Sequence, residues 1–155
     1  MDRFVLTHSP LFMYLAENNL TGDFITETIA VMTKMEIFNL FSNSLGGPLP
    51  PVVGAFTNLK ALDLEMNMFT GPVVIADFVA LSQLEQYLVG SNKLTGPLPG
   101  AIENWTKLRI LSLAFNMIDG PLPPEIGSLT DLGTTWYIGP FCDPRVYVSR
   151  INMIH

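Results

Sequence analysis

Hydrophobic and polar residues repeat along this chain with a period of 24 to 25 residues. In each period two apolar residues flank one variable residue, and an asparagine stands three residues after the second of them. The five asparagines, spaced 25, 24, 25 and 24 residues apart, are Asn18, Asn43, Asn67, Asn92 and Asn116. Another apolar residue stands eight positions before each of the last four, so the register extends over residues 10–132. A fixed period of this length predicts repeating units that stack on one another.

The alternation of apolar and variable positions predicts one short strand per repeat with one buried face. The expected buried pairs are Met13/Leu15, Phe38/Leu40, Leu62/Leu64, Tyr87/Val89 and Leu111/Leu113. A single strand cannot pair within its own repeat, so we expect it to pair in parallel with the next repeat, ~4.8 Å away.

The asparagines have an expected structural role. Where each strand ends the chain must turn inward, and the buried backbone N–H and C=O groups there need partners. An asparagine side chain offers both a donor and an acceptor. We therefore expect Asn18, Asn43, Asn67, Asn92 and Asn116 to form a ladder of amide hydrogen bonds along the stack.

Turn residues complete each repeat. Four residues after each asparagine stands a glycine, which permits a positive φ; these are Gly22, Gly47, Gly71, Gly96 and Gly120. A proline follows the last four of these glycines, which suits an extended segment that changes direction. Residues 102–108 and 125–132 are short apolar-periodic pieces and predict single helical turns on the opposite, convex side.

The repeats match the pattern LxxLxLxxNxL of the leucine-rich repeat family. The T-G-P-L-P and D-G-P-L-P segments that follow resemble its plant-specific subclass, known from receptor-like kinase ectodomains and polygalacturonase-inhibiting proteins. The resemblance implies an α/β solenoid of about five repeats, with a parallel concave sheet, short helical or 3-10 turns on the convex side and a second small sheet. The first repeat carries Asp23 and Ile25 where others carry prolines, and the third carries Val74, which puts the second sheet in doubt there.

The ends of the chain depart from the repeat. Residues 1–9 form an N-terminal flank, residues 10–132 the solenoid, and residues 133–155 an irregular tail or a degenerate sixth repeat, because the sixth position in phase is Pro140. The resembled extracellular proteins cap their ends with cysteine pairs, whereas Cys142 is the only cysteine here and is interpreted as a buried, inert thiol. We interpret the chain as a fragment or an eroded copy of a longer array, and uncapped ends predict self-association.

Composition excludes several classes of protein. A hydrophobic content of 48% excludes a disordered tail, and a net charge of -6 without a Lys/Arg cluster excludes nucleic-acid binding. The sequence has no apolar stretch long enough to cross a membrane, and its first residues do not form a signal peptide. The chain is therefore intracellular or lacks its natural N-terminus, while the resemblance implies an extracellular or membrane-associated protein.

Catalytic chemistry is not expected. His8 and His155 lie outside the repeats, and no catalytic, metal-binding or cofactor-binding motif is present, so we predict no enzyme, cofactor or metal. Asp63 and Glu65 share an exposed strand face and offer a site for a cation or a basic ligand, with a solvated surface as the alternative. Asn19 and Asn104 begin N-x-[ST] sequons, which matter only if the protein is secreted.

The strand residues that point away from the core form the candidate binding face, which is apolar for exposed positions. The predicted contact residues are Tyr14, Asn39, Phe41, Asp63, Glu65, Leu88, Ile110, Ser112 and Phe115. The patch measures roughly 300–400 Å², less than the ~800 Å² per partner of a standard interface, so it suits a short peptide or part of a larger face. The leading hypothesis is a protein- or peptide-binding module of a receptor-like or inhibitor-like protein. The alternative is a repeat remnant with a structural or self-associating role and no ligand of its own.

Overall fold

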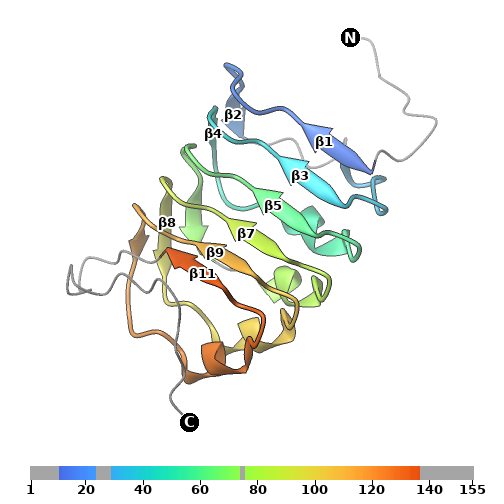
Figure 1. Ribbon diagram of the computed structural model, residues 1–155. Coiled ribbons are helices and arrows are strands. Elements are labelled where there is room, and N and C mark those ends of the chain that lie inside the picture. Colours follow the sequence, from blue (N-terminus) through green and yellow to red (C-terminus); the bar gives the residue numbers. More distant parts are fainter. Residues whose placement is uncertain (1–10, 24–28, 74–75, 137–155) are drawn as a thin grey trace.

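The computed structural model describes residues 11–23, 29–73 and 76–136, which form a curved stack of parallel strands (Figure 1). The main sheet has six strands in chain order. They are β1 (Phe12–Tyr14), β3 (Ile37–Asn39), β5 (Ala61–Asp63), β7 (Gln86–Leu88), β9 (Ile110–Ser112) and β11 (Thr134–Trp136). The predicted parallel pairing between neighbouring repeats is confirmed.

The register of the main sheet places equivalent residues of successive repeats side by side. Phe38 pairs with Leu62, Leu62 with Tyr87, and Tyr87 with Leu111. All four side chains are fully buried, so the inner side of the sheet is a continuous apolar layer. Burial of this layer in neighbour contacts is what stabilises a stack of short strands.

A second strand segment in each repeat begins one to three residues after the asparagine. These strands are β2 (Thr21–Asp23), β4 (Ser44–Gly46), β6 (Thr70–Pro72), β8 (Lys93–Gly96) and β10 (Met117–Ile118). They form a two-stranded sheet, β2 with β4, and a three-stranded sheet of β6, β8 and β10. The sequence put this second strand in doubt at the first and third repeats, and that expectation was wrong. The paired segments end at Asp23 in β2 and at Pro72 in β6, one residue after the glycine, so they do not reach positions 25 and 74.

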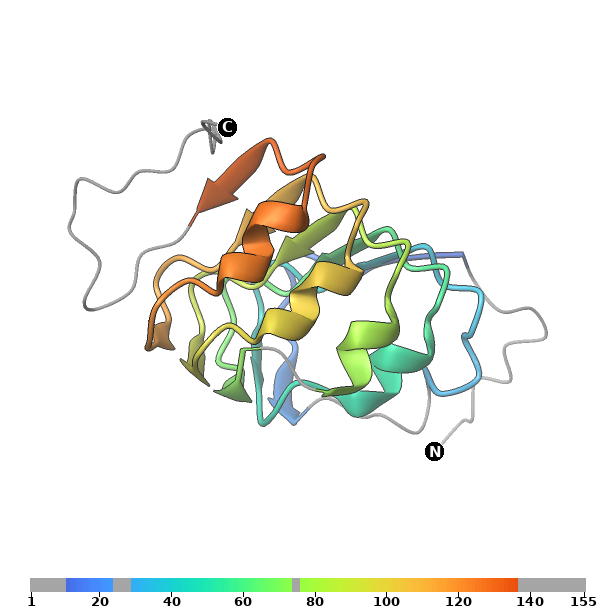
Figure 2. The same cartoon turned by 90° about the horizontal axis from the view of Figure 1, so that it is seen from below.

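Short 3-10 helices line the side opposite the main sheet (Figure 2). They are η1 (Pro51–Ala55), η2 (Ala76–Ala80), η3 (Gly100–Asn104) and η4 (Pro124–Ser128). The last two begin within two residues of the predicted starts but end four residues earlier than predicted, because the chain leaves the helix through a turn. No helix among the described residues is both long and apolar enough to span a membrane.

The core lies between the main sheet and the 3-10 helices and contains an aromatic cluster. The Tyr87 ring lies 4.9 Å from the Trp105 ring and 6.4 Å from the Phe78 ring, measured between centroids. The Tyr87 hydroxyl donates to the Val73 carbonyl at 2.5 Å, and Trp105 Nε1 donates to the Phe78 carbonyl at 2.9 Å. Both buried donors are therefore satisfied, and burial raises the pKa of the Tyr87 hydroxyl well above its ordinary value.

Each anchoring asparagine joins two repeats through the backbone. Asn67 Nδ2 donates to the Leu40 carbonyl of the preceding repeat at 2.9 Å and to the Leu64 and Glu65 carbonyls of its own repeat. Its Oδ1 accepts the N–H of Leu45 at 3.1 Å. The same pattern recurs at the asparagines of the next two repeats. The links run from the asparagine side chain to the backbone, as expected from the need of the buried N–H and C=O groups for partners.

The first repeat is less buried than the sequence predicts. Leu15 was expected in the core, but it is 37% exposed, and Met13 is only partly buried. The reason is that β1 is the outermost described strand of the sheet, so only one neighbouring repeat covers it. Asn18 is likewise exposed, and its amide donates to the Leu15 and Ala16 carbonyls of its own repeat.

A left-handed residue precedes every anchoring asparagine, a feature that the repeat period does not reveal. The five positions have φ between 53° and 57°; they are Glu17, Ser42, Met66, Ser91 and Phe115. The predicted positive φ of the five turn glycines is confirmed, with values from 74° to 86°. Each repeat therefore turns inward through two left-handed residues, and only one of them is a glycine.

The main sheet continues past residue 132. Strand β11 pairs in parallel with β9, with Thr134 opposite Ile110. It lies within residues 133–155, for which the sequence predicts either an irregular tail or a degenerate sixth repeat. The described residues begin at 11 and end at 136, so His8, Cys142 and His155 lie outside them.

We predict that Asn67→Ala lowers the free energy of unfolding by at least about 1–3 kcal/mol, because it leaves the buried Leu45 N–H and Leu40 carbonyl without a partner. Asn58→Ala is the matched control, since Asn58 is exposed in a turn on the convex side. Urea unfolding midpoints measure both variants. Equal shifts for the two variants would contradict the role given to Asn67.

Candidate functional site

The sheet register brings five of the predicted contact residues into one row across the concave face. Tyr14 pairs with Asn39, Asn39 with Asp63, Asp63 with Leu88, and Leu88 with Ser112. Each is the last residue of its strand. We call these five residues the concave row. Of the other four, Ile110 begins β9, while Phe41 and Glu65 lie two residues beyond the row and Phe115 three residues beyond β9.

Polar bonds fix the orientation of the row at its centre. Asn39 Nδ2 donates to Asp63 Oδ2 at 3.2 Å, and Asn39 Oδ1 accepts the N–H of Phe41 at 2.9 Å. Asp63 Oδ1 accepts the N–H of Glu65 at 3.1 Å. The amide and the carboxylate are therefore held in place before any ligand arrives, which lowers the entropic cost of binding.

Glu65 and Ser112 are joined across an intervening repeat. The Ser112 hydroxyl donates to Glu65 Oε1, and the bond passes over Gly90. A Cβ at Gly90 would lie 2.6 Å from Glu65 Oε1 and 3.0 Å from the Ser112 hydroxyl, so a larger residue would force the Glu65 carboxylate to shift. Ser112 itself is only 7% exposed and orients Glu65, so it offers little surface for contact with a ligand.

Gly90 is therefore a site residue that the predicted contact list omits. Gly90 is equivalent to Phe41 and Glu65 of the other repeats, because each stands two residues before the anchoring asparagine. A signal was present in the sequence, because glycine at a strand-face position indicates the close approach of another group. Its partners could not be named, since they come from the two flanking repeats.

Asp63 carries the main titratable group of the row. Burial raises the pKa of its carboxyl to about 6, and the Glu65 charge acts in the same direction, whereas the Glu65 N–H and the Asn39 amide lower the pKa. At neutral pH the group is charged, and within the described residues no cation pairs with it. A basic group of a ligand at this point would relieve the cost of desolvation.

The apolar contact residues differ in exposure. Tyr14 and Phe115 are 64% and 69% exposed, whereas Phe41, Leu88 and Ile110 are half-buried. Phe115 adopts the left-handed conformation three residues beyond β9, so it stands outside the concave row. The row thus combines one exposed aromatic, a fixed polar centre and one half-buried aliphatic residue.

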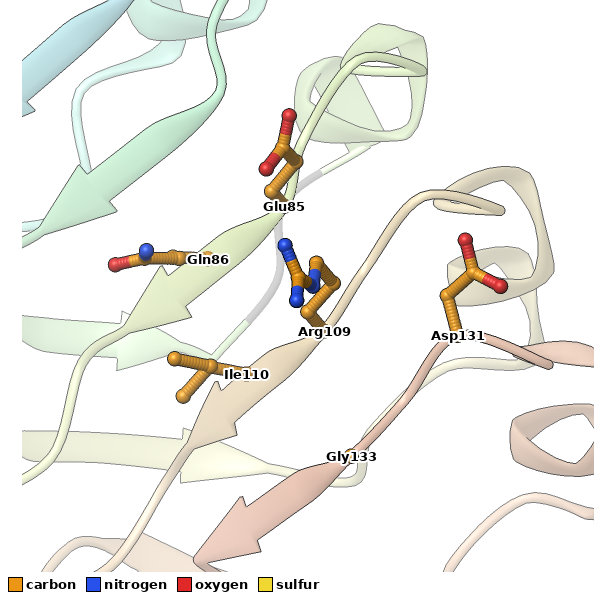
Figure 3. A pocket seen from close by; sticks show the side chains of 6 residues that line it. All are labelled: Glu85, Gln86, Arg109, Ile110, Asp131 and Gly133. Atoms are coloured by element: carbon orange, nitrogen blue, oxygen red, sulfur yellow. The ribbon is translucent and has the colours of Figure 1, made fainter.

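A shallow hollow of about 360 Å³ opens at the edge of the main sheet where β7, β9 and β11 begin (Figure 3). It is lined by Glu85, Gln86, Arg109, Ile110, Asp131 and Gly133. Its charged groups are two carboxylates, Glu85 and Asp131, and one guanidinium, Arg109. Among the described residues, no group of three or more His, Cys, Asp or Glu side chains could hold a metal ion.

The hollow follows from a column of residues that immediately precede the main strands. The column contains Glu36, Lys60, Glu85 and Arg109, whose charges alternate, and ends at Gly133. Lys60 Nζ and Glu36 Oε2 form an ion pair at 2.7 Å. The N–H of Gly133 donates to the Arg109 carbonyl at 3.0 Å, so the two residues are neighbours. Because Gly133 has no side chain, the space beside Arg109 stays open.

The two sequons lie on the surface. Asn19 and Asn104 are both exposed, and Asn104 Nδ2 donates to the Ala101 carbonyl at 3.1 Å at the end of η3. Both asparagines are therefore accessible, and their modification stays a prediction.

We expect the Asp63 carboxyl to titrate near pH 6 in NMR experiments. A raised pKa means that the folded state binds the proton more tightly than the unfolded state, whose ordinary value is ~3.9. The free energy of unfolding should therefore fall as pH rises from about 4 to 6, and Asp63→Asn should remove this part of the pH dependence. Asn39→Ala should raise the midpoint further, because the Asn39 amide stabilises the charged form. A midpoint near 4 would contradict the burial argument.

We predict that Gly133→Glu extends the alternating column and stabilises the fold by about 0.2–1 kcal/mol at low salt. A Cβ at Gly133 meets only the Arg109 carbonyl, at an ordinary 3.9 Å, so the side chain is accommodated. Gly133→Gln is the control, because it has a similar size without the charge. Thermal unfolding at 50 mM and 1 M NaCl measures the effect, and equal stabilisation by both variants would exclude pairing with Arg109.

Comparisons with known proteins agree with this architecture. The family model described as Leucine Rich Repeat matches residues 107–129. Among curated protein sequences, none matches the chain. The solved structures give high similarity, but the chain spans only a part of each.

One similar solved structure is that of the plant peptide hormone receptor RGFR1 in complex with RGF2. It has 29% identity and a TM-score of 0.75 over 79% of this chain and 19% of the receptor. The second is the ectodomain of the Arabidopsis thaliana receptor kinase GASSHO1/SCHENGEN3 in complex with CASPARIAN STRIP INTEGRITY FACTOR 2. It has 30% identity and a TM-score of 0.76 over 80% of this chain and 15% of that one.

A leucine-rich repeat protein of Leptospira interrogans is also similar, with 32% identity and a TM-score of 0.67 over 83% of this chain and 31% of that one. The fold is thus not confined to plants. The period, the parallel sheet, the 3-10 turns and these neighbours lead to one conclusion. The chain forms a leucine-rich repeat solenoid with repeats of the plant type, and it resembles the ectodomains of plant receptor kinases.

Proposed function

We propose that this chain binds an extended peptide on the concave row, as one part of a receptor-like or inhibitor-like protein, and that it acts by recognition and not by catalysis. The observation that carries the proposal is the row itself. Five neighbouring strands align Tyr14, Asn39, Asp63, Leu88 and the buried Ser112 in register. The charged carboxyl of Asp63 at the centre has no cationic partner among the described residues.

The dimensions of the row support a peptide ligand. Four strand spacings of ~4.8 Å make a row ~19 Å long, which is the reach of about six residues of extended chain. Tyr14 lies at one end and Leu88 beyond the centre, so apolar groups flank the carboxyl of Asp63. A peptide with a basic residue between two apolar residues complements this arrangement.

The structural neighbours support the same class of ligand. RGFR1 is a peptide hormone receptor in complex with RGF2, and the GASSHO1/SCHENGEN3 ectodomain is in complex with CASPARIAN STRIP INTEGRITY FACTOR 2. We extend this role to the present chain as a proposal, because the chain spans 19% and 15% of those two proteins. An extracellular location belongs to the same proposal.

The second candidate is a repeat remnant that only associates with other repeats. The exposed apolar side chains of the first repeat favour it; they are Leu11, Phe12, Tyr14, Leu15, Leu20 and Val31. Leu11, Phe12, Tyr14 and Leu15 lie on or next to β1, the outermost described strand. A remnant of this kind would associate through the strand edge and would not need the polar centre at Asp63.

A random 12-residue peptide library displayed on phage and selected against the full chain tests the proposal. We expect selected peptides to lose at least about tenfold in affinity on Leu88→Ser and on Asp63→Asn, a loss of about 1.4 kcal/mol. The matched controls are Val31→Ser, which is exposed off the row, and Asp131→Asn, a carboxylate on the sheet edge. Fluorescence polarisation measures each affinity. Selected peptides that bind both row variants as tightly as the parent chain would exclude the concave row.

A further inference from the structure

Outside the first repeat, four large apolar side chains are exposed in the segments that follow strands β5 and β9. Met66 and Met68 flank the anchor Asn67 and are 52% and 43% exposed; Phe115 and Met117 flank the anchor Asn116 and are 69% and 54% exposed. The repeat between them carries Ser91 and Lys93 at the same two positions, on either side of Asn92. We call these six residues the rim.

Folding does not account for the two apolar residues that precede the asparagines. Met66 and Phe115 adopt left-handed conformations with φ of 55° and 57°, which are unfavourable for bulky side chains. The equivalent residues of three other repeats are Glu17, Ser42 and Ser91. Neither Met66 nor Phe115 gains burial in return, so backbone strain and an exposed apolar side chain occur together. Strain without internal compensation indicates a role outside the fold.

The rim places a small residue between two large apolar ones. The Asn67 N–H donates to the Ser91 carbonyl at 3.2 Å, and the Asn92 N–H donates to the Phe115 carbonyl at 3.2 Å, so the three left-handed residues occupy successive repeats. Met66 and Phe115 are therefore two strand spacings apart, ~10 Å, with the small Ser91 between them. An aliphatic side chain fits between two apolar walls at this separation.

Lys93 gives the rim a charge. It is exposed one residue beyond Asn92, and its N–H donates to the Phe69 carbonyl at 2.8 Å, which fixes its backbone beside the repeat of Met66 and Met68. Within the described residues its ammonium group has no ion pair. The rim thus presents a single cation with apolar side chains on both sides.

We propose that the rim is a docking site for a protein segment that carries an aliphatic side chain next to a carboxylate. The aliphatic side chain enters over Ser91 between Met66 and Phe115, and the carboxylate pairs with Lys93. Methionine suits such a surface, because its flexible and polarizable side chain adapts to a partner. The rim lies beyond the concave row, so this docking site does not depend on a peptide bound to that row.

The first test separates a binding role from a folding role. Asparagine tolerates the left-handed conformation better than methionine or phenylalanine does. Met66→Asn and Phe115→Asn should therefore leave Tm unchanged or raise it by a few degrees. A fall in Tm for either variant would show that the side chain supports the fold, and the proposal would be overturned.

The second test measures recognition with the phage library of random 12-residue peptides. Phage that bind the full chain are incubated with the immobilised double variant Met66→Asn/Phe115→Asn, and the phage that bind the variant are removed. The remaining phage carry peptides specific for the rim. We expect these peptides to carry Leu, Ile or Val within two residues of Asp or Glu. Their affinity should fall at least tenfold on Phe115→Asn. It should fall about threefold on Lys93→Gln at 50 mM NaCl, and this second loss should shrink at 500 mM NaCl.

Three controls keep this result separate from the concave row. Leu88→Ser and Asp63→Asn should leave binding of the rim peptides unchanged, and Val31→Asn controls for the loss of an exposed apolar residue elsewhere. A selection that leaves no peptide after depletion would overturn the rim without affecting the row. Rim peptides that lack an acidic residue and bind Lys93→Gln as tightly as the parent chain would overturn the proposed partner chemistry.

Discussion

The whole structure depends on hydrogen bonds between an asparagine side chain and the backbone of two neighbouring repeats. A chain that turns inward every 24 residues exposes backbone N–H and C=O groups to an apolar interior, where unpaired groups are costly. Asn67 satisfies one N–H and one carbonyl of the preceding repeat together with two carbonyls of its own. The repeat unit is therefore stable only as part of a stack, and the spacing of the asparagines sets the register of every strand.

This register also creates the surfaces that can recognise a ligand. Because equivalent positions align across the sheet, residues 24 or 25 apart in the sequence become direct neighbours, as Asn39 and Asp63 do. Residues two repeats apart also meet when the position between them is small, as Glu65 and Ser112 do over Gly90. Different residues at aligned surface positions therefore give each repeat a different surface without changing the core of the stack.

Much of the fold could be predicted from the sequence, because burial and turn chemistry are local and periodic. The buried strand residues from Phe38 to Leu113 and the five left-handed glycines follow from period and residue type alone. The left-handed residue before each asparagine could not be predicted, because its identity varies from glutamate to phenylalanine. The second sheet was misjudged at two repeats, since the prolines that suggested it lie outside the hydrogen-bonded segment or at its end.

The candidate site was predictable in part. Alternation along each strand identified Tyr14, Asn39, Asp63 and Leu88 as residues of the concave face, and the sheet register then placed them in one row. The burial of Ser112 and the need for glycine at position 90 depend on how far Glu65 reaches, which periodicity does not encode. The exposure of the apolar rim side chains likewise depends on how neighbouring repeats pack, which the repeat period does not encode.

Amide hydrogen exchange tests the central claim most directly. The N–H groups of Leu45, Phe69 and Leu94 each donate to the Oδ1 of an anchoring asparagine in the next repeat. If these bonds hold the stack together, the three N–H groups exchange only through global unfolding, as slowly as the most protected strand residues. Exchange as rapid as that of the exposed Lys107 or Thr57 would contradict the account.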